Sequence, residues 1–129
     1  TVAREVADAT SVGPGLVFPY AFAGEVLEEH AQAGPGGSCH GGEFETSLML
    51  HLAPDLVEMH EATFEDRIRE EFPYSSNEAF VSTWTRQKSK HGIYGDPTPA
   101  TAELGELAFD KMVEKTTGFI RHYYELEQV

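Results

Sequence analysis

The sequence is poor in basic residues, and this scarcity excludes one large class of partner. Only 9 lysines and arginines stand against 22 aspartates and glutamates in 129 residues, which gives a formal net charge of −13. Binding to a phosphate backbone requires clustered basic side chains, and the one basic cluster is Arg86, Lys88, Lys90 and His91. We therefore expect no nucleic-acid partner.

Cysteines and long apolar runs are also scarce. The single cysteine, Cys39, cannot form a disulfide within the chain, which is typical of a reducing compartment. No run of about 18 apolar residues is present, so no membrane-spanning helix is expected. Residues 1–10 lack the charged and apolar blocks of a signal peptide. These absences predict a cytoplasmic protein without a membrane partner.

The apolar residues that are present predict a helix-rich chain with one strand. Their spacing predicts three helices, over residues 1–10, 43–52 and 102 to about 126, the last with Thr101 as N-cap, and a helical turn at 25–31. The apolar run 16–22 predicts a buried strand, and residues 55–57 predict a short extended piece. One strand cannot form a sheet, because unpaired backbone is costly to bury. We therefore expect an α/β domain whose other strands lie outside this chain.

Two loops stand out between these elements. Residues 33–42 are rich in glycine, which allows the backbone to approach a ligand closely. Residues 72–99, which include Trp84, show no regular pattern. A loop of that length is uncommon unless it is functional or takes part in assembly.

The stretch GGSCHGGEFETSLML, residues 36–50, places His40 between two glycine pairs just before a predicted helix. Glu45 falls in the first turn of that helix, where a carboxylate is favoured by the helix dipole. A histidine can give or take a proton near neutral pH, and an adjacent carboxylate fixes its tautomer. His40 and Glu45 are therefore a candidate acid–base pair for protonating a leaving nitrogen or activating water.

Three other interpretations of this stretch stay open on spacing alone. Glu45 could serve only to start the helix, while His40 lines a loop. His40, Glu43 and Glu45 could supply two or three metal ligands, although the His-Glu-x-x-His and paired Cys-x-x-Cys signatures are absent. Cys39 could act as a nucleophile beside His40, but adjacent residues on an extended loop usually point apart.

The run HGGEFETSLML at 40–50, followed by PDLV at 54–57, resembles the signature of the creatinine amidohydrolase (creatininase) family. GIYGDP at 92–97 and ATAELGE at 100–106 resemble the C-terminal part of that family. The resemblance extends from about the first residue to the last. It implies a three-layer α/β/α fold and a two-metal hydrolase that opens amide and related C–N bonds.

The family's metal-ligand motifs, an early Glu-x-His-Gly, a nearby aspartate and a later Asn-Gly-His, have no counterpart in this chain. The bare Glu-x-His spacing occurs at 28–30 and 58–60, without the glycine. The resemblance thus implies that residues 1–129 are the C-terminal part of a single creatininase-like domain. Its parts are the signature loop and helix at 36–57, a long loop at 72–99 and the C-terminal helix at about 102–126. A partner chain with the N-terminal half would bind two divalent ions (zinc, manganese or iron), with no metal ligand in this chain.

The resemblance assigns the role of general acid or base to His40 and an orienting role to Glu45. The candidates for substrate binding are Ser38, Cys39 and Gly41. The family's best-known member holds creatinine with a tryptophan and an acidic residue just before the histidine, and residues 36–39 occupy those places here. This departure predicts a substrate larger than creatinine or differently shaped.

The predicted function is that of one subunit of a metal-dependent amidohydrolase, active only in a complex of higher order. It would cleave an amide or other C–N bond of a small substrate, whether cyclic or not. Two alternatives are a non-catalytic regulatory or assembly subunit, and an isomerase or lyase on the same scaffold. The two halves would come from two genes or from processing, in which case Thr1 is a candidate nucleophile for the cleavage.

Overall fold

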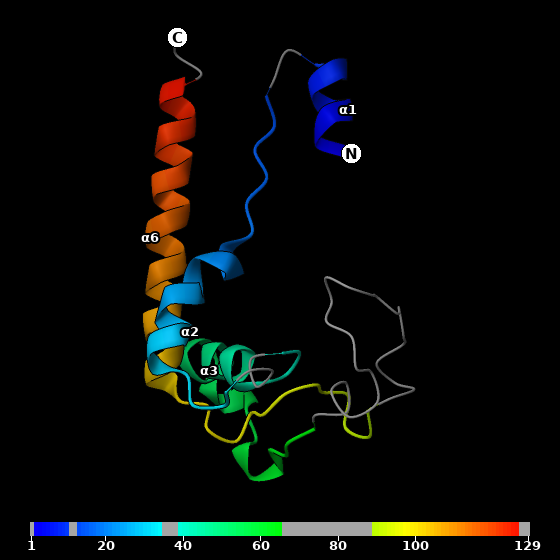
Figure 1. The fold of residues 1–129 in the computed structure, drawn as a ribbon, viewed down its shortest axis with the longest axis vertical. Coiled ribbons are helices and arrows are strands. Elements are labelled where there is room, and N and C mark those ends of the chain that lie inside the picture. Colours follow the sequence, from blue (N-terminus) through cyan, green and yellow to red (C-terminus); the bar gives the residue numbers. More distant parts are fainter. Residues whose placement is uncertain (1, 11–12, 35–38, 66–88, 127–129) are drawn as a thin grey trace.

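The computed structural model describes residues 2–10, 13–34, 39–65 and 89–126, and within these ranges the chain is mainly helical (Figure 1). The α-helices are α1 (Val2–Ala9), α2 (Gly24–His30), α3 (Glu43–Leu52) and α6 (Ala102–Leu126). Short 3-10 helices are η1 (Pro19–Ala23), η2 (Pro54–Leu56) and η3 (Met59–Glu61). The one β pairing in the described ranges is an isolated antiparallel bridge between Glu65 and Gly95.

The three predicted helices are present, and the helical turn predicted at 25–31 lies largely within the helix α2. Local chemistry explains where two of these helices begin or end. Oγ1 of Thr101 accepts a hydrogen bond of 3.1 Å from the backbone N–H of Leu104, which confirms Thr101 as the N-cap of α6. The helix α3 begins directly after Gly42 and stops before Pro54. Proline cannot continue a helix, because it lacks the N–H and its ring clashes with the preceding turn.

The predicted strand at 16–22 is wrong. Residues 13–18 form no regular element, Pro19 starts η1, and Leu16 and Phe18 are 69 % and 67 % exposed. Proline has no N–H to give to a strand ladder, and its fixed φ suits the first position of a helical turn. In the described ranges no second strand lies beside this segment to pair with it.

The predicted extended piece at 55–57 is wrong for the same reason. Pro54 begins η2, which covers Pro54–Leu56, and only Val57 has extended backbone angles, φ −110° and ψ 119°. In both segments the apolar residues lie next to a proline that begins a 3-10 helix. Pro19 begins η1, and Pro54 begins η2.

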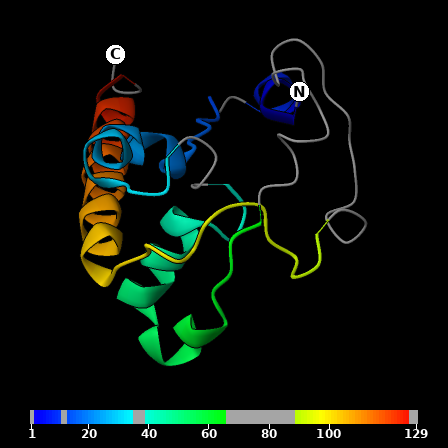
Figure 2. The same ribbon diagram turned by 60° about the horizontal axis from the view of Figure 1, so that its bottom comes forward.

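The core lies where α3 crosses the N-terminal part of α6, with α2 along the same helix (Figures 1 and 2). Its buried apolar residues are Ala23, Phe44, Leu48, Ala108 and Met112. The two helices approach so closely that a Cβ on Gly105 would lie 2.0 Å from the carbonyl oxygen of Ser47. Oγ of Ser47, itself fully buried, accepts a hydrogen bond of 3.1 Å from the N–H of Thr101. The start of α6 is thereby tied to the middle of α3.

The N-terminal part of the chain stands away from this core. Residues 13–18 extend from η1 along α6, and α1 lies far from α3 in both views and contains no buried residue. Large apolar side chains are consequently exposed along this part, among them Val2, Leu16, Phe18 and Tyr20.

Part of the predicted loop 72–99 can be compared with the structure. Residues 89–99 contain bends, a turn and the bridge at Gly95, in agreement with an irregular segment. Trp84, Arg86 and Lys88 lie outside the described residues, so the predictions that concern them stay predictions. Of the helices that the structure describes, none combines the length and the apolar composition that crossing a membrane requires.

Candidate functional site

The structure brings His40 and Glu45 together at the start of α3. Nδ1 of His40 lies 3.6 Å from Oε2 of Glu45. The same oxygen accepts a hydrogen bond of 2.7 Å from the backbone N–H of Gly41. The His40 side chain is 65 % exposed and that of Glu45 46 % exposed. An exposed imidazole whose Nδ1 faces a carboxylate has its Nε2 available to another molecule.

The local sequence explains why Glu45 turns back toward the loop. It lies three residues after Gly42, the N-cap of α3, and reaches a backbone N–H just before the helix, as the glutamate of a capping box does. Gly41 makes the turn with φ +66°, which a side chain would disfavour. One carboxylate therefore serves both the helix start and the imidazole, and these two interpretations of Glu45 do not exclude each other.

The main chain around His40 is held by a distant segment. The carbonyl oxygen of His40 accepts a hydrogen bond of 2.7 Å from the N–H of Tyr94. Ile93 packs so closely on Gly41 that a Cβ on this glycine would lie 2.6 Å from Cγ2 of Ile93. The conformation of the His40 loop thus depends on residues more than fifty positions further along the chain.

The carboxylate of Glu43 is bound to another part of the chain, so it does not join His40 and Glu45 as a third metal ligand. The side chain of Glu43 is 1 % exposed, and its two oxygens accept backbone N–H bonds of 2.9 and 3.0 Å from Gln32 and one of 2.8 Å from Ala33. The carboxylate therefore holds the end of α2 to the start of α3. Across the described ranges no group of three or more His, Cys, Asp or Glu side chains is placed to hold a metal ion. These residues do not fit a metal centre by themselves.

Of the three substrate-binding candidates, the structure describes two, Cys39 and Gly41. Ser38 lies outside the described residues. Cys39 carries an exposed free thiol, and Gly41 lines a pocket. Their contact with substrate stays a prediction.

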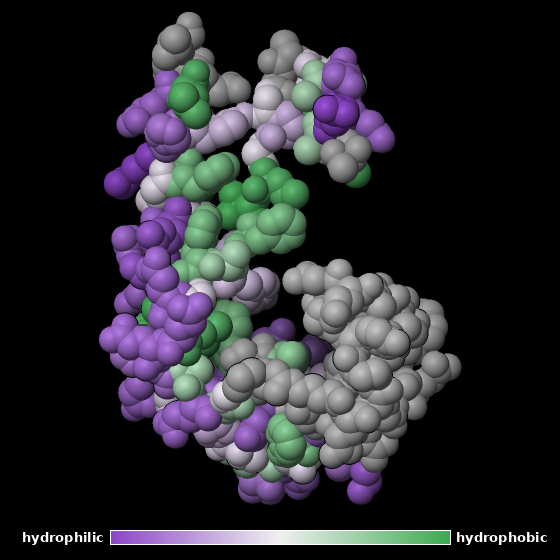
Figure 3. Space-filling view, viewed as in Figure 1, coloured by the Kyte–Doolittle hydropathy of each residue, from purple (hydrophilic) through white to green (hydrophobic). Residues whose placement is uncertain are grey.

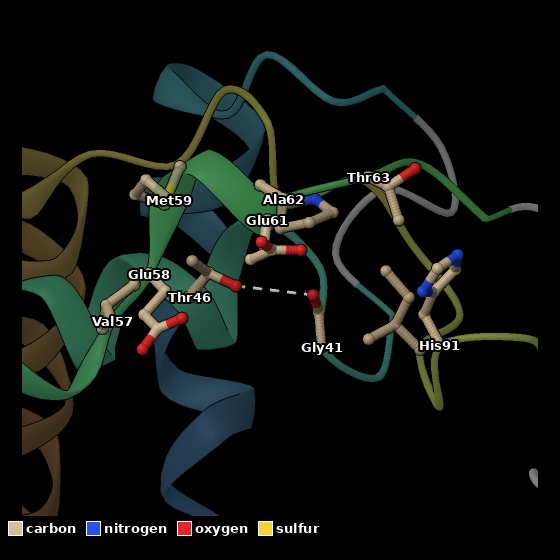
Figure 4. A pocket seen from close by; sticks show the side chains of 11 residues that line it. Gly41, Thr46, Val57, Glu58, Met59, Glu61, Ala62, Thr63 and His91 are labelled. Atoms are coloured by element: carbon tan, nitrogen blue, oxygen red, sulfur yellow. Dashed lines mark hydrogen bonds between the residues drawn. The ribbon is translucent and has the colours of Figure 1, made fainter.

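A pocket of about 390 Å³ opens beside the signature loop (Figure 4). Gly41 and Thr46 form one wall, and Figure 4 shows Glu58 and Glu61 near them, with His91 across the space. Oγ1 of Thr46 donates a long hydrogen bond, 3.4 Å, to the carbonyl oxygen of Gly41. The loop that carries His40 thus borders a cavity within the chain itself.

Sequence reasoning missed Glu65, a buried carboxylate near the same loop. It accepts hydrogen bonds from the hydroxyl of Ser89 and from the backbone N–H groups of Lys90, at 3.0 Å, and His91, at 3.4 Å. The Ser89 bond is the main cause that holds the pKa of Glu65 below its ordinary value, against the opposing effect of burial. In the sequence Glu65 is one acidic residue in a charged stretch, and its donors are about 25 residues away, so no local signal singles it out.

Comparison with known proteins places these features in a family. The family model for creatininase, described as creatinine amidohydrolase, matches residues 1–120. A mycofactocin precursor peptide peptidase of Mycolicibacterium smegmatis is 30 % identical over 96 residues, which cover 69 % of this chain and 35 % of that protein. A protein of the same name from Mycobacterium ulcerans is 34 % identical over 82 residues, covering 61 % of this chain and 30 % of that protein.

Solved structures agree with the family match. A creatininase variant in complex with creatine matches with a TM-score of 0.69 at 24 % identity, over 94 % of this chain and 48 % of that chain. A manganese creatininase gives a TM-score of 0.68 at 24 % identity, over 93 % of this chain and 47 % of that one. The chain thus spans about a third of the curated relatives and about half of the solved creatininases. It has part of the α/β fold of the creatininases, and with the signature at 40–57 and the match over residues 1–120 it belongs to the creatininase family.

Proposed function

We propose that this chain supplies the acid–base group of a hydrolase that cleaves an amide or related C–N bond. The observation that carries the proposal is the His40–Glu45 pair, 3.6 Å apart and exposed, at the signature of the family. Relatives with the names creatininase and peptide peptidase support this reaction class. The role of His40 is to protonate the nitrogen that departs when the C–N bond breaks.

Glu45 decides which nitrogen of His40 performs that step. Its carboxylate lies at Nδ1 and therefore favours the form of the imidazole with a proton on this atom. Nε2 is left to take up a proton from the attacking water and to deliver it to the departing nitrogen, so that the imidazole is neutral before and after the step. Because Glu45 is also bound to the N–H of Gly41, the carboxylate cannot turn freely, and it orients the ring.

We propose that the ligands of two divalent ions (zinc, manganese or iron) come mainly from a partner that carries the other half of the domain. The described residues of this chain contain no ligand group, and solved relatives with zinc or with manganese support the choice of metal. Such ions act as Lewis acids and supply an activated water. In this proposal residues 1–129 are the C-terminal part of one creatininase-like domain, and the complete complex is a higher-order oligomer.

An apolar surface supports docking of that partner. Figure 3 shows apolar side chains gathered beside α6, facing the open space between α6 and α1. Leu16, Phe18 and Tyr20 belong to the exposed apolar residues of this part of the chain. Large exposed apolar patches mark interaction sites in proteins. The remaining half of the creatininase fold is the occupant that we propose, because this chain covers only 48 % of the solved chain that it matches.

For the substrate we propose a peptide or another amide rather than creatinine. The relatives with peptidase names support a peptide, and residues 36–39 lack the tryptophan and acidic side chain expected for holding creatinine. The cytoplasm remains our prediction for the compartment, on the ground of the lone free cysteine at position 39.

The decisive experiment is His40→Ala in the complex of this chain with its co-purified partner. We expect turnover to fall by at least about a hundredfold, since general acid–base catalysis contributes roughly 10²–10⁴-fold. Metal content, measured by elemental analysis, is expected to stay unchanged because this chain supplies no ligand. A matched control is His60→Ala, since His60 is an exposed histidine that lies 3.4 Å from the carboxylate of its neighbour Glu61.

The same experiment separates the alternatives. Unchanged turnover in the His40→Ala complex would reject the acid–base role and favour a regulatory or assembly subunit. Incorporation of oxygen from labelled water into the product distinguishes hydrolysis from an isomerase or lyase reaction, because only hydrolysis adds water across the bond. A His40→Ala complex that loses its metal would contradict the assignment of the ligands to the partner.

A further inference from the structure

We propose that Glu65 is a positioning residue for His40. The proposal rests on the acid–base role of His40 given above. Glu65 acts through the backbone and not by contact with the imidazole. It fixes the segment 89–95 with both its carboxylate and its backbone, and that segment holds the loop on which His40 sits.

The carboxylate of Glu65 gathers three hydrogen-bond donors from one short stretch. They are the hydroxyl of Ser89 and the backbone N–H groups of Lys90 and His91. Oγ of Ser89 in turn accepts a hydrogen bond of 2.6 Å from the N–H of Gly92. Residues 89–92 are thereby wrapped around a single buried side chain.

The backbone of Glu65 holds the other end of the same segment. Its N–H donates to the carbonyl oxygen of Gly95 at 3.1 Å, and its carbonyl oxygen accepts from the N–H of Gly95 at 2.9 Å. Gly95 is buried and has φ +156°. One residue therefore anchors residues 89–92 by its side chain and Gly95 by its main chain.

Between these two anchors lie the residues that contact the His40 loop. The N–H of Tyr94 donates to the carbonyl oxygen of His40 at 2.7 Å, and Ile93 packs on Gly41. Glu45, by contrast, belongs to α3, whose position is set by the core. The distance between His40 and Glu45 thus depends on two separate supports, and Glu65 determines one of them.

A carboxylate suits this place better than an amide of the same length. It offers two acceptor oxygens to three donors, whereas glutamine offers one oxygen and brings two further N–H donors. Glu65→Gln should therefore keep the size of the side chain and still loosen the 89–92 turn. The movement that follows at Tyr94 should change the position of the His40 main chain relative to Glu45.

The test is Glu65→Gln in the assembled enzyme. We expect kcat to fall by about tenfold to a hundredfold with KM changed much less, because a shift of about 1 Å in a catalytic group can cost that much. In parallel, the ¹⁵N chemical shifts of the His40 ring, assigned by comparison with His40→Ala, should show a changed distribution of the proton between Nδ1 and Nε2. The matched control is Glu29→Gln, an exposed glutamate 3.8 Å from His30 on α2, for which both readouts should stay unchanged.

A second, milder variant guards against a folding failure. Ser89→Ala removes one of the three donors and should give a smaller effect in the same direction, and in the double variant with Glu65→Gln the two effects should not add. The proposal is overturned if specific activity falls only in proportion to the folded fraction while the His40 ring signals stay as in the wild type. The ring signals also keep the two proposals apart, because they report the coupling even if His40 proves dispensable for turnover.

Discussion

At the scale of single residues, Gly41 shows how the loop of His40 obtains its shape. The turn needs φ +66°, and the space beside the α-carbon is already filled by Ile93. The N–H of Gly41 donates a hydrogen bond to the carboxylate of Glu45, and its carbonyl oxygen accepts one from the hydroxyl of Thr46. The backbone conformation of the loop, its packing on Ile93 and the orientation of Glu45 therefore all depend on Gly41.

Gly41→Ala should destabilise the protein more than Gly34→Ala. Both glycines have positive φ, +66° and +60°, which costs a side chain about 1–2 kcal/mol. Only at Gly41 does the new Cβ meet a neighbour, at 2.6 Å from Ile93, and overpacking adds about 1–3 kcal/mol. Denaturant unfolding measures both losses. Equal losses of unfolding free energy in the two variants would show that the Ile93 side chain moves aside at no cost. In an Ile93→Ala background the difference between the two losses should become smaller.

The contribution of Glu65 to stability should depend on pH. The hydroxyl of Ser89, followed by the N–H groups of His91 and Lys90 and the charge of His91, holds the pKa of this carboxyl below its ordinary value. Because folding lowers the pKa, the contribution is complete above the unfolded value, about 4.3. It is lost as the pH falls through the lower value of the folded state.

The measurement compares the wild type with Glu65→Gln, in which the group cannot titrate. The difference in unfolding free energy is expected to be constant between about pH 6 and pH 8 and to shrink as the pH approaches about 3. Denaturant titrations of both proteins at about pH 7 and at about pH 3 measure this difference in unfolding free energy. A difference that grows toward acid pH would mean that burial, not hydrogen bonding, dominates at this site.

At the scale of elements, the crossing of α3 and α6 is the part on which the site depends. α3 carries Glu45, and α6 meets it through Gly105 and through the bond from the N–H of Thr101 to Ser47. A glycine in the middle of a helix costs about 1 kcal/mol relative to alanine. At Gly105 this cost is offset by the close approach that it permits.

Substitution by alanine should therefore have opposite effects at two glycines of α6. Gly105→Ala gains about 1 kcal/mol of helix propensity, but its Cβ would lie 2.0 Å from a backbone oxygen, and the helices must separate. We expect a net loss of at least about 2 kcal/mol, with a lower melting temperature. Gly118→Ala meets nothing within 4 Å and should raise the melting temperature. Effects of the same sign would refute this account of the crossing.

At the scale of the whole molecule, the exposed apolar segment 13–18 is the surface on which our proposal places the partner. Leu16 and Phe18 are 69 % and 67 % exposed, and Gly15 lies against Phe119 of α6. The segment is apolar enough for a strand, yet within the described chain it has no strand to join. In our proposal the partner half covers it.

The double variant Leu16→Ser and Phe18→Ser should weaken binding to the co-purified partner. Burying one such side chain contributes about 1.5–3 kcal/mol, so the dissociation constant should rise by at least about a hundredfold. Leu52→Ser, at the exposed end of α3, is the control and should leave the constant within about threefold. Equal effects of both variants would place the partner elsewhere.

Much of the secondary structure could be predicted from the sequence, whereas the supports of the site could not. The helices, the Thr101 cap and the nearness of His40 to Glu45 depend on contacts between residues at most five positions apart, and such contacts can be predicted along the chain. Glu43 and Glu45 look alike in the sequence, two positions apart, but the helix turns one into the core and the other toward His40. Which of the two glutamates is buried can be known only from the positions of Gln32 and Ala33, whose N–H groups bind the carboxylate of Glu43.

The sequence by itself determined the family, the helices and the candidate acid–base pair, because signatures, caps and apolar spacing are local. Only the tertiary structure decided that residues 16–18 do not form a strand here, since a strand exists through its pairing with another. Only it revealed that Glu65 and Ser89 meet and that Tyr94 holds His40. Such contacts join residues 24 to 54 positions apart, and chain folding, not residue order, brings them together.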